Sequence, residues 1–188
     1  MAEESPFVDV ALRVAKRILK HPLVVQRGAP LLYEVKVNTN LEVMEPERIR
    51  KPSRGSSAFQ TDLCIFDESK PGVLIPRVVM EFKTKISTHD VLTYSAKAGK
   101  HKTIYPYLRY GIVASSERAV PGRVFTHNEN LDFFASVHGL KGKGLENFFA
   151  SLLKKEVKSS RCLENIAYGR VKTRLFRQEV LISHRDAA

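Results

Sequence analysis

The 188-residue chain has few cysteines, no long apolar run and a shortage of acidic residues. Its two cysteines, Cys64 and Cys162, are too few for a disulfide framework and lack zinc-finger spacing, which indicates a reducing compartment. No stretch approaches the ~18–20 apolar residues of a transmembrane helix, and the acidic start at residues 1–4 is unlike a signal peptide. These absences exclude disulfide-rich and zinc-finger classes, and we expect a cytoplasmic protein with no membrane partner.

Acidic residues are outnumbered by basic ones, since 20 Asp and Glu stand against 31 Lys and Arg to give a formal net charge of +11. A surplus of this size is typical of proteins that bind a polyanion, most often nucleic acid. The hydrophobic share of 43% is enough to bury a core, so we expect most of the chain to fold. The length fits a single domain over residues 1–188.

Hydrophobic periodicity and turn signals predict the order of helices and strands. The expected elements are a helix over residues 5–20, strands over 31–37, 59–66 and 73–83, a helix over 87–102, a strand over 110–114, a helix over 145–157 and a strand over 171–182. Pro76 predicts a bulge or an edge position, and Ser87 with Asp90 fits a capping box. The αβββαβ order predicts an α/β core over about residues 7–115, with a central mixed sheet of four to five strands flanked by helices and a C-terminal extension over about 116–188.

Three charged residues near the predicted hairpin carry the strongest functional signal: Asp62, Glu81 and Lys83. The Glu-x-Lys triplet alone says little, because it also occurs at Glu34 and Glu156. Residues i and i+2 of a strand share a face, so Glu81 and Lys83 should point the same way while Phe82 points to the core. A hairpin centred on the Pro71-Gly72 turn signal then places Asp62 directly across from Glu81.

Two carboxylates at cross-strand distance, about 5 Å between Cβ atoms, repel each other unless one is protonated or a cation lies between them. Mg2+ binds one or two carboxylates and completes its octahedron with water and phosphate oxygens. Lys83 beside such a site can hold the attacking water and offset charge on a phosphate. The group therefore predicts metal-dependent phosphodiester hydrolysis, and the alternative is an ordinary charge cluster on a surface hairpin.

The spacing of Asp62, 18 further residues and then Glu81-Phe82-Lys83 at the end of an apolar strand resembles the PD-(D/E)XK nuclease superfamily, most of all its type II restriction endonucleases. The resemblance covers about residues 7–115 and implies a restriction-endonuclease-like core. It implies that Asp62, Glu81 and the Phe82 main-chain carbonyl bind Mg2+, and that Lys83 is catalytic. Thr61 stands where the family often has proline.

The acidic residue that many members of this family carry on the first helix has no clear counterpart in the chain. Asp9 on the first predicted helix and Glu34 on the next predicted strand are the candidates for this accessory role.

Basic residues flank the acidic pair in the sequence. Residues 45–57 lack periodicity and are expected to form a basic loop, and the helix that follows Lys83 should carry a basic face made by positions i, i+3 and i+4. The residues expected to contact DNA are Arg48, Arg50, Lys51, Arg54, Lys97, Lys100 and His101. The alternative for each of them is a solvated surface charge.

The first functional hypothesis is a Mg2+-dependent endodeoxyribonuclease that cuts double-stranded DNA at a specific sequence in a restriction system. Such an enzyme is expected to act as a homodimer on a palindromic site, with the C-terminal extension contacting DNA or forming the dimer. The second hypothesis is a repair, recombination or phage nuclease of the same superfamily that recognises DNA structure. The third is a non-catalytic nucleic-acid-binding protein.

Overall fold

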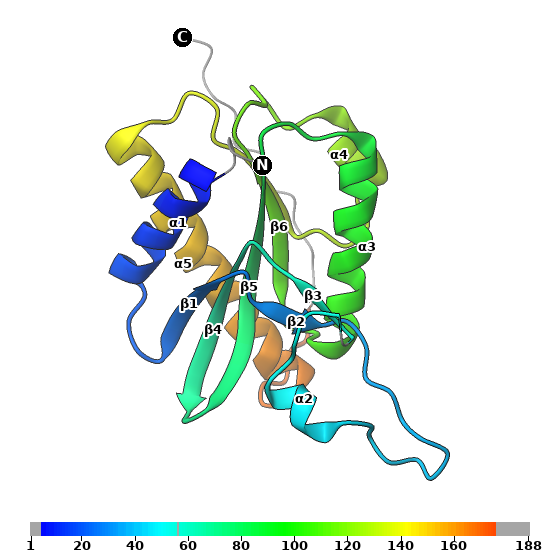
Figure 1. Cartoon of the computed structure of the whole chain (residues 1–188). Helices are drawn as coiled ribbons and strands as arrows, with labels where there is room; N and C mark the ends of the chain where they lie inside the picture. Colours follow the sequence, from blue (N-terminus) through cyan, green and yellow to red (C-terminus); the bar gives the residue numbers. More distant parts are fainter. Residues whose placement is uncertain (1–4, 56, 176–188) are drawn as a thin grey trace.

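The computed structural model describes residues 5–55 and 57–175, and its centre is a five-stranded mixed sheet flanked by helices (Figure 1). The strands lie in the order β1-β4-β5-β6-β7. Their bounds are β1 (Leu23–Arg27), β4 (Leu63–Lys70), β5 (Val73–Lys83), β6 (Arg109–Ala114) and β7 (Phe133–Ser136). The first three are antiparallel neighbours, and β6 and β7 run parallel to β5. The predicted α/β class and mixed central sheet are confirmed.

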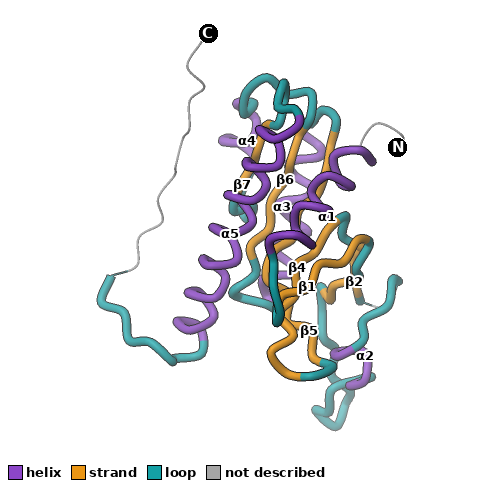
Figure 2. The backbone as a smooth tube through the Cα atoms, turned by 90° about the vertical axis from the view of Figure 1, so that its left-hand side faces the viewer, coloured by secondary structure: helices purple, strands orange, loops and turns teal. Residues whose placement is uncertain are grey.

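Two pairs of helices cover the two faces of this sheet (Figures 1 and 2). One face packs against α1 (Ser5–Ile18) and α5 (Gly142–Ala167), and the other against α3 (Thr88–Ile104) and α4 (Gly122–His127). Successive strand residues serve opposite faces, so Met80 packs with the α1–α5 layer while Val79 packs with α3. A second, two-stranded sheet pairs β2 (Pro30–Leu32) with β3 (Ala58–Gln60), and a short helix, α2 (Pro46–Arg50), lies between them in sequence.

The first strand of the central sheet lies at Leu23–Arg27, and the prediction of a strand over residues 31–37 is wrong beyond Leu32. Leu31 and Leu32 are buried in β2, but the chain leaves the sheet after Leu32. Within residues 33–45, all of which the structure describes, the only β-bridge joins Val37 and Val43. Val37 is 57% exposed, so the alternation of valines in this segment does not reflect a buried face.

The predicted strand over residues 59–66 is split at Thr61 and Asp62. The Thr61 backbone N–H and hydroxyl both donate to the Ala29 carbonyl, at 3.0 and 2.9 Å, which holds this residue at the end of the small sheet. The chain then enters β4 at Leu63. The break leaves Asp62 outside both strands, at the point where β3 ends and β4 begins.

The hairpin of β4 and β5 has the predicted register, since Leu63 pairs with Met80 and Ile65 with Val78. The register shifts after Ile65, where Phe66 pairs with Pro76, so the predicted bulge at Pro76 is confirmed. The capping box is also confirmed: the Ser87 hydroxyl accepts from the Asp90 N–H at 3.1 Å, and the Asp90 carboxylate accepts from the Ser87 N–H at 2.8 Å.

The C-terminal part differs most from the prediction. The last helix runs from Gly142 to Ala167 and is therefore longer than residues 145–157, and α4 and β7 were not expected. Residues 171–175 of the predicted strand over 171–182 are not in a strand, and the rest of that segment lies outside the described residues. No helix in the described part of the chain is long and apolar enough to cross a membrane.

Candidate active site

Asp62 and Glu81 meet where β5 extends past the start of β4. Because β4 begins at Leu63 opposite Met80, the last three residues of β5 have no partner in β4. Asp62 lies beside them: its Oδ2 accepts from the Phe82 N–H at 2.8 Å, and its own N–H donates to Glu81 Oε2 at 3.4 Å. The predicted juxtaposition of the two carboxyl groups is confirmed.

The three residues of the Glu81-Phe82-Lys83 segment face as the strand period predicts. Phe82 is 1% exposed and packs against Phe149 of α5, with 6.2 Å between ring centroids. Lys83 lies on the α3 side, where its Nζ is 5.7 Å from the centroid of the Tyr94 ring. The N–H and C=O of one strand residue point to the same side, so the Phe82 carbonyl faces the side of β5 on which Asp62 lies.

Glu81 is a buried acid whose negative charge is only partly stabilised by its surroundings. Its side chain is 3% exposed, and its Oε1 accepts a hydrogen bond from the Tyr110 hydroxyl at 2.5 Å. Burial in the first place, and the charge of Asp62 in the second, raise the pKa of Glu81 to about 7 although the Tyr110 hydrogen bond opposes the rise. An additional cation at this position would remove the conflict between the two acids.

The α3 side of the site is lined by lysine and aromatic side chains. Lys97 Nζ lies 5.1 Å from the Tyr94 centroid and 5.5 Å from the Phe59 centroid, and Lys100 Nζ lies 5.2 Å from the Tyr33 centroid. Burial, followed by the charge of Glu81, raises the pKa of Tyr94 to about 12, so its hydroxyl stays protonated at neutral pH. Lys97 and Lys100, held over ring faces in this way, make the surface beside the carboxyl pair positively charged.

The prediction that His101 lies on this exposed basic face is wrong, because its side chain is fully buried. The residue continues the buried stripe of α3, three positions after the buried Ala98. Its Nδ1 lies 2.7 Å from the Leu32 carbonyl oxygen, and its ring stacks on Tyr110 with 5.7 Å between centroids. Burial lowers its pKa, and no atom is left exposed for a DNA contact.

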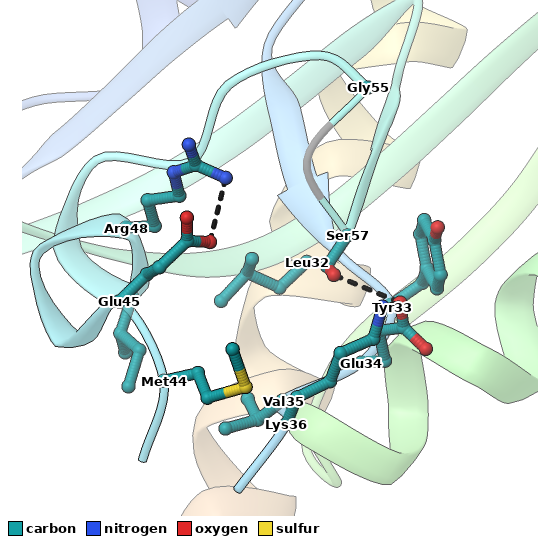
Figure 3. Close-up of a pocket in the computed structure, with 11 residues that line it drawn as sticks. Leu32, Tyr33, Glu34, Val35, Lys36, Met44, Glu45, Arg48, Gly55 and Ser57 are labelled. Carbon is teal, nitrogen blue, oxygen red and sulfur yellow. Dashed lines mark hydrogen bonds and ion pairs between the residues drawn. The ribbon is translucent and has the colours of Figure 1, made fainter. Parts of the chain in front are cut away.

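The predicted basic loop contains the short helix α2 and borders a pocket of ≈ 320 Å³ (Figure 3). Arg48, in this pocket, forms an ion pair with Glu45 at 2.7 Å, so one of the residues expected to contact DNA has an acidic partner. Arg50, Lys51 and Arg54 are exposed. Asp62 and Glu81 do not line this pocket, so the structure separates it from the carboxyl pair.

Neither predicted accessory acid joins the carboxyl pair. Glu34 lines the α2 pocket, accepts from the Ser57 hydroxyl at 2.9 Å and pairs with Lys36 at 3.0 Å, and the Lys36 contact lowers its pKa (Figure 3). Asp9 lies on α1, in the layer on the other face of the sheet, and pairs with Arg27 at 2.7 Å. Residues 5–55 and 57–175 contain no group of three or more His, Cys, Asp or Glu side chains that could hold a metal ion. A metal at this site would therefore rely on Asp62, Glu81 and the Phe82 carbonyl, and this oxygen-only donor set fits Mg2+.

Sequence reasoning missed the two tyrosines that contact the charged residues. Tyr110 donates to Glu81 and Tyr94 lies against Lys83, and neither tyrosine is among the predicted site residues. The available signal was that a buried tyrosine hydroxyl needs a hydrogen-bond partner. The sequence alone does not identify Glu81 as the hydrogen-bond partner of Tyr110.

No protein-family model matches this sequence, and no curated protein shows significant similarity to it. The functional interpretation therefore depends on the residues and geometry of the site.

Proposed function

We propose that this chain is a Mg2+-dependent endodeoxyribonuclease that hydrolyses phosphodiester bonds of double-stranded DNA. The observation that carries the proposal is the buried carboxyl group of Glu81, held beside Asp62 and two residues from Lys83 where β5 extends past β4. Burying a second acid next to the first is costly unless one of them is protonated or a cation binds there. Above about pH 7, where Glu81 ionises, a bound cation would offset this cost.

Each residue of the site has a separate role in the proposed phosphodiester hydrolysis. Asp62 and Glu81, with the Phe82 carbonyl, would hold Mg2+, which supplies polarisation of the phosphate and a more acidic water. The Phe82 N–H orients Asp62, and the Tyr110 hydroxyl orients Glu81. The Lys83 ammonium group offsets charge that develops on the phosphate and holds the attacking water.

Within this proposal, the first candidate is a type II-like restriction endonuclease of the PD-(D/E)XK superfamily, which acts on a specific sequence as a homodimer. The central-sheet strands and their helices support it, because α1, β1, β4, β5, α3 and β6 follow the αβββαβ order of the resemblance, with β2, α2 and β3 inserted between β1 and β4. A nuclease of the same superfamily that recognises DNA structure is the second candidate. Arg48, whose side chain is suited to reading guanine, forms an exposed ion pair with Glu45, and this weak pair would have to open before Arg48 could contact a base.

Digestion of plasmid DNA tests the proposal. With Mg2+ the parent protein should cut, with EDTA it should not, and Lys83→Ala and Asp62→Asn should each reduce the rate at least ~100-fold. Lys36→Ala is the matched control, because Lys36 is the lysine of another Glu-x-Lys triplet and lies in a surface ion pair. Each variant should keep the circular-dichroism melting profile of a folded chain.

The products decide between the candidates. Discrete fragments support sequence-specific cutting, whereas structure-dependent nicking or a smear supports the second candidate. Cutting by Lys83→Ala at the parent rate would show that the assigned site is wrong. Mg2+-independent binding without cleavage of any substrate would leave a nucleic-acid-binding protein.

A further inference from the structure

The outward surface of α1 and α5 carries basic side chains that are not neutralised by acidic side chains of the described residues. Eight Lys and Arg stand against four Asp and Glu in these two helices. Six of the basic residues are exposed and form no ion pair with any described residue: Arg13, Lys16, Lys143, Lys154, Lys155 and Lys158. We call this set the α1–α5 basic face.

The four acidic residues of the two helices are all engaged with other cations. Asp9 pairs with Arg27, Glu146 with Arg17, Glu156 with Arg109, and Glu164 with Arg77 and Arg170. None of them is therefore left to balance the α1–α5 basic face. The exposed cations need counterions from solution or from a partner.

The two helices present these residues on one surface. Val8, Ala11 and Ala15 of α1 and Phe149 and Leu153 of α5 belong to a single buried cluster, so the opposite stripe of each helix faces solvent. The Arg17–Glu146 ion pair, at 2.9 Å, joins the helices at the surface. Figure 2 looks onto this layer and shows α1 and α5 next to each other in front of the sheet.

The chemistry of the face favours nucleic acid over a lipid bilayer. A helix that binds a bilayer surface buries large apolar side chains next to its basic residues. Among the described residues of α1 and α5, the only large apolar side chain classed as exposed is Ile166, near the C-terminal end of α5. Lysine side chains without exposed large apolar neighbours are suited to binding a phosphate backbone, which proceeds through counterion release.

We propose that the α1–α5 basic face binds the phosphate backbone of a second DNA segment. The candidate active site lies on the α3 side of the sheet, because Glu81 contacts Tyr110 and Lys83 lies against Tyr94 of α3. The two surfaces are therefore separated by the sheet and its buried side chains. A chain that engages DNA on both faces holds two duplex segments together, whether or not it cleaves either of them.

Salt-dependent binding tests the face. Fluorescence anisotropy of a labelled 20-base-pair duplex is measured in EDTA over a salt series, with the parent and with the triple variant Lys154→Gln, Lys155→Gln and Lys158→Gln. Log K falls by about 0.9 per phosphate contact per decade of salt, so the triple variant should reduce the slope by about 2–3. Lys70→Gln is the matched control, because Lys70 is exposed at the β4–β5 turn, and it should leave the slope unchanged. An unchanged slope in the triple variant would overturn the proposal.

Energy transfer between two duplexes tests simultaneous binding. One duplex carries a donor dye and the other an acceptor, and the parent protein should bring them together. The triple variant should lose this signal. If it retains the signal, the bridging comes from two active sites in a dimer and the proposal fails. Tighter binding of the parent to phosphatidylserine vesicles than to DNA would also overturn it.

Cys162 gives a local reporter for the same face. It is the exposed cysteine, it lies four residues after Lys158 on α5, and Cys64 is fully buried. A maleimide dye on Cys162 should change its emission when DNA is added to the parent protein, and the change should persist in the Lys97→Gln, Lys100→Gln variant of the opposite face. No change in either protein would contradict a contact here. The cleavage test with Lys83→Ala is independent of all these results.

Discussion

Replacing Glu81 with glutamine should stabilise the protein at pH 8 and remove its response to Mg2+. Glutamine keeps the volume of the side chain, and its carbonyl oxygen can accept the hydrogen bond that Tyr110 donates to Glu81. Its amide group takes the place of Oε2, so the long hydrogen bond from the Asp62 N–H, at 3.4 Å, is lost, but the amide can donate toward the Asp62 carboxylate. The substitution therefore removes a charge without opening a cavity.

The size of the effect follows from the pKa of Glu81, which rises from 4.5 to about 7 because of burial and the charge of Asp62. One pKa unit corresponds to ~1.4 kcal/mol, so ionising Glu81 in the folded chain costs about 3 kcal/mol of stability above pH 7. Below about pH 4.5 the group is protonated in the folded and the unfolded chain, and the cost disappears. Between these limits the folded chain binds the extra proton, so stability falls as the pH rises.

Urea unfolding of the parent and the variant at pH 5 and pH 8, without metal, measures the cost of ionising Glu81 as the difference between their free energies of unfolding. The variant should gain little at pH 5 and about 2–3 kcal/mol at pH 8, equivalent to roughly 4–12 °C in Tm for a chain of this size. Mg2+ at ~100 times its Kd should stabilise the parent by about 2.7 kcal/mol at pH 8 and leave the variant unchanged.

Glu34→Gln is the control for the Glu81 measurement. The Lys36 contact, followed by the Ser57 hydrogen bond, lowers the pKa of Glu34, so its ionised form is favoured in the folded chain. Removing that charge should give no gain at pH 8. Identical pH profiles for the parent and Glu81→Gln would refute the reasoning, because Glu81 would then not be the acid that burial and Asp62 keep protonated.

Three further substitutions test the supports of the site and the fold. Tyr110→Phe leaves Glu81 Oε1 without its donor and should cost about 1–3 kcal/mol in urea unfolding above pH 7, with a weaker response to Mg2+. Gly111→Ala places a Cβ in steric conflict with the Phe133 ring and should cost about 1–3 kcal/mol, measured in the same way. Ser87→Ala removes the capping box of α3 and should lower stability by about 1 kcal/mol without changing metal binding.

The carboxyl pair could be predicted because it depends on local information. The Pro71-Gly72 turn signal and the long apolar run of β5 fix the hairpin and its register, and the register places Asp62 beside Glu81. Strand alternation then assigns Phe82 to the core and Lys83 to the side of Glu81. None of these steps requires knowledge of a distant segment.

The parts that could not be predicted depend on tertiary contacts. Residues 31–37 alternate as a strand would, but Tyr33 instead stacks on Phe59 at 4.1 Å between ring centroids and the chain leaves the sheet. The true edge strand, β1, is a five-residue segment whose pairing with β4 has no local turn signal. His101 satisfies the spacing of a basic face and also that of the buried stripe, and only the packing of α3 on Tyr110 decides between them.

The net charge and the candidate active site are separate observations. The charge of +11 first suggested a polyanion partner, yet the exposed cations of α1 and α5 lie on the face of the sheet that Glu81 does not occupy. On the other face, Lys97 and Lys100 are held over aromatic rings next to two acids. Replacing Asp62 and Glu81 by their amides would leave the positive charge of α1 and α5 unchanged. Neutralising Lys154, Lys155 and Lys158 would leave the carboxyl pair unchanged. A nuclease needs the carboxyl pair, whereas a protein that only coats DNA needs the charge, so the buried acid of Glu81 is the feature that distinguishes the two.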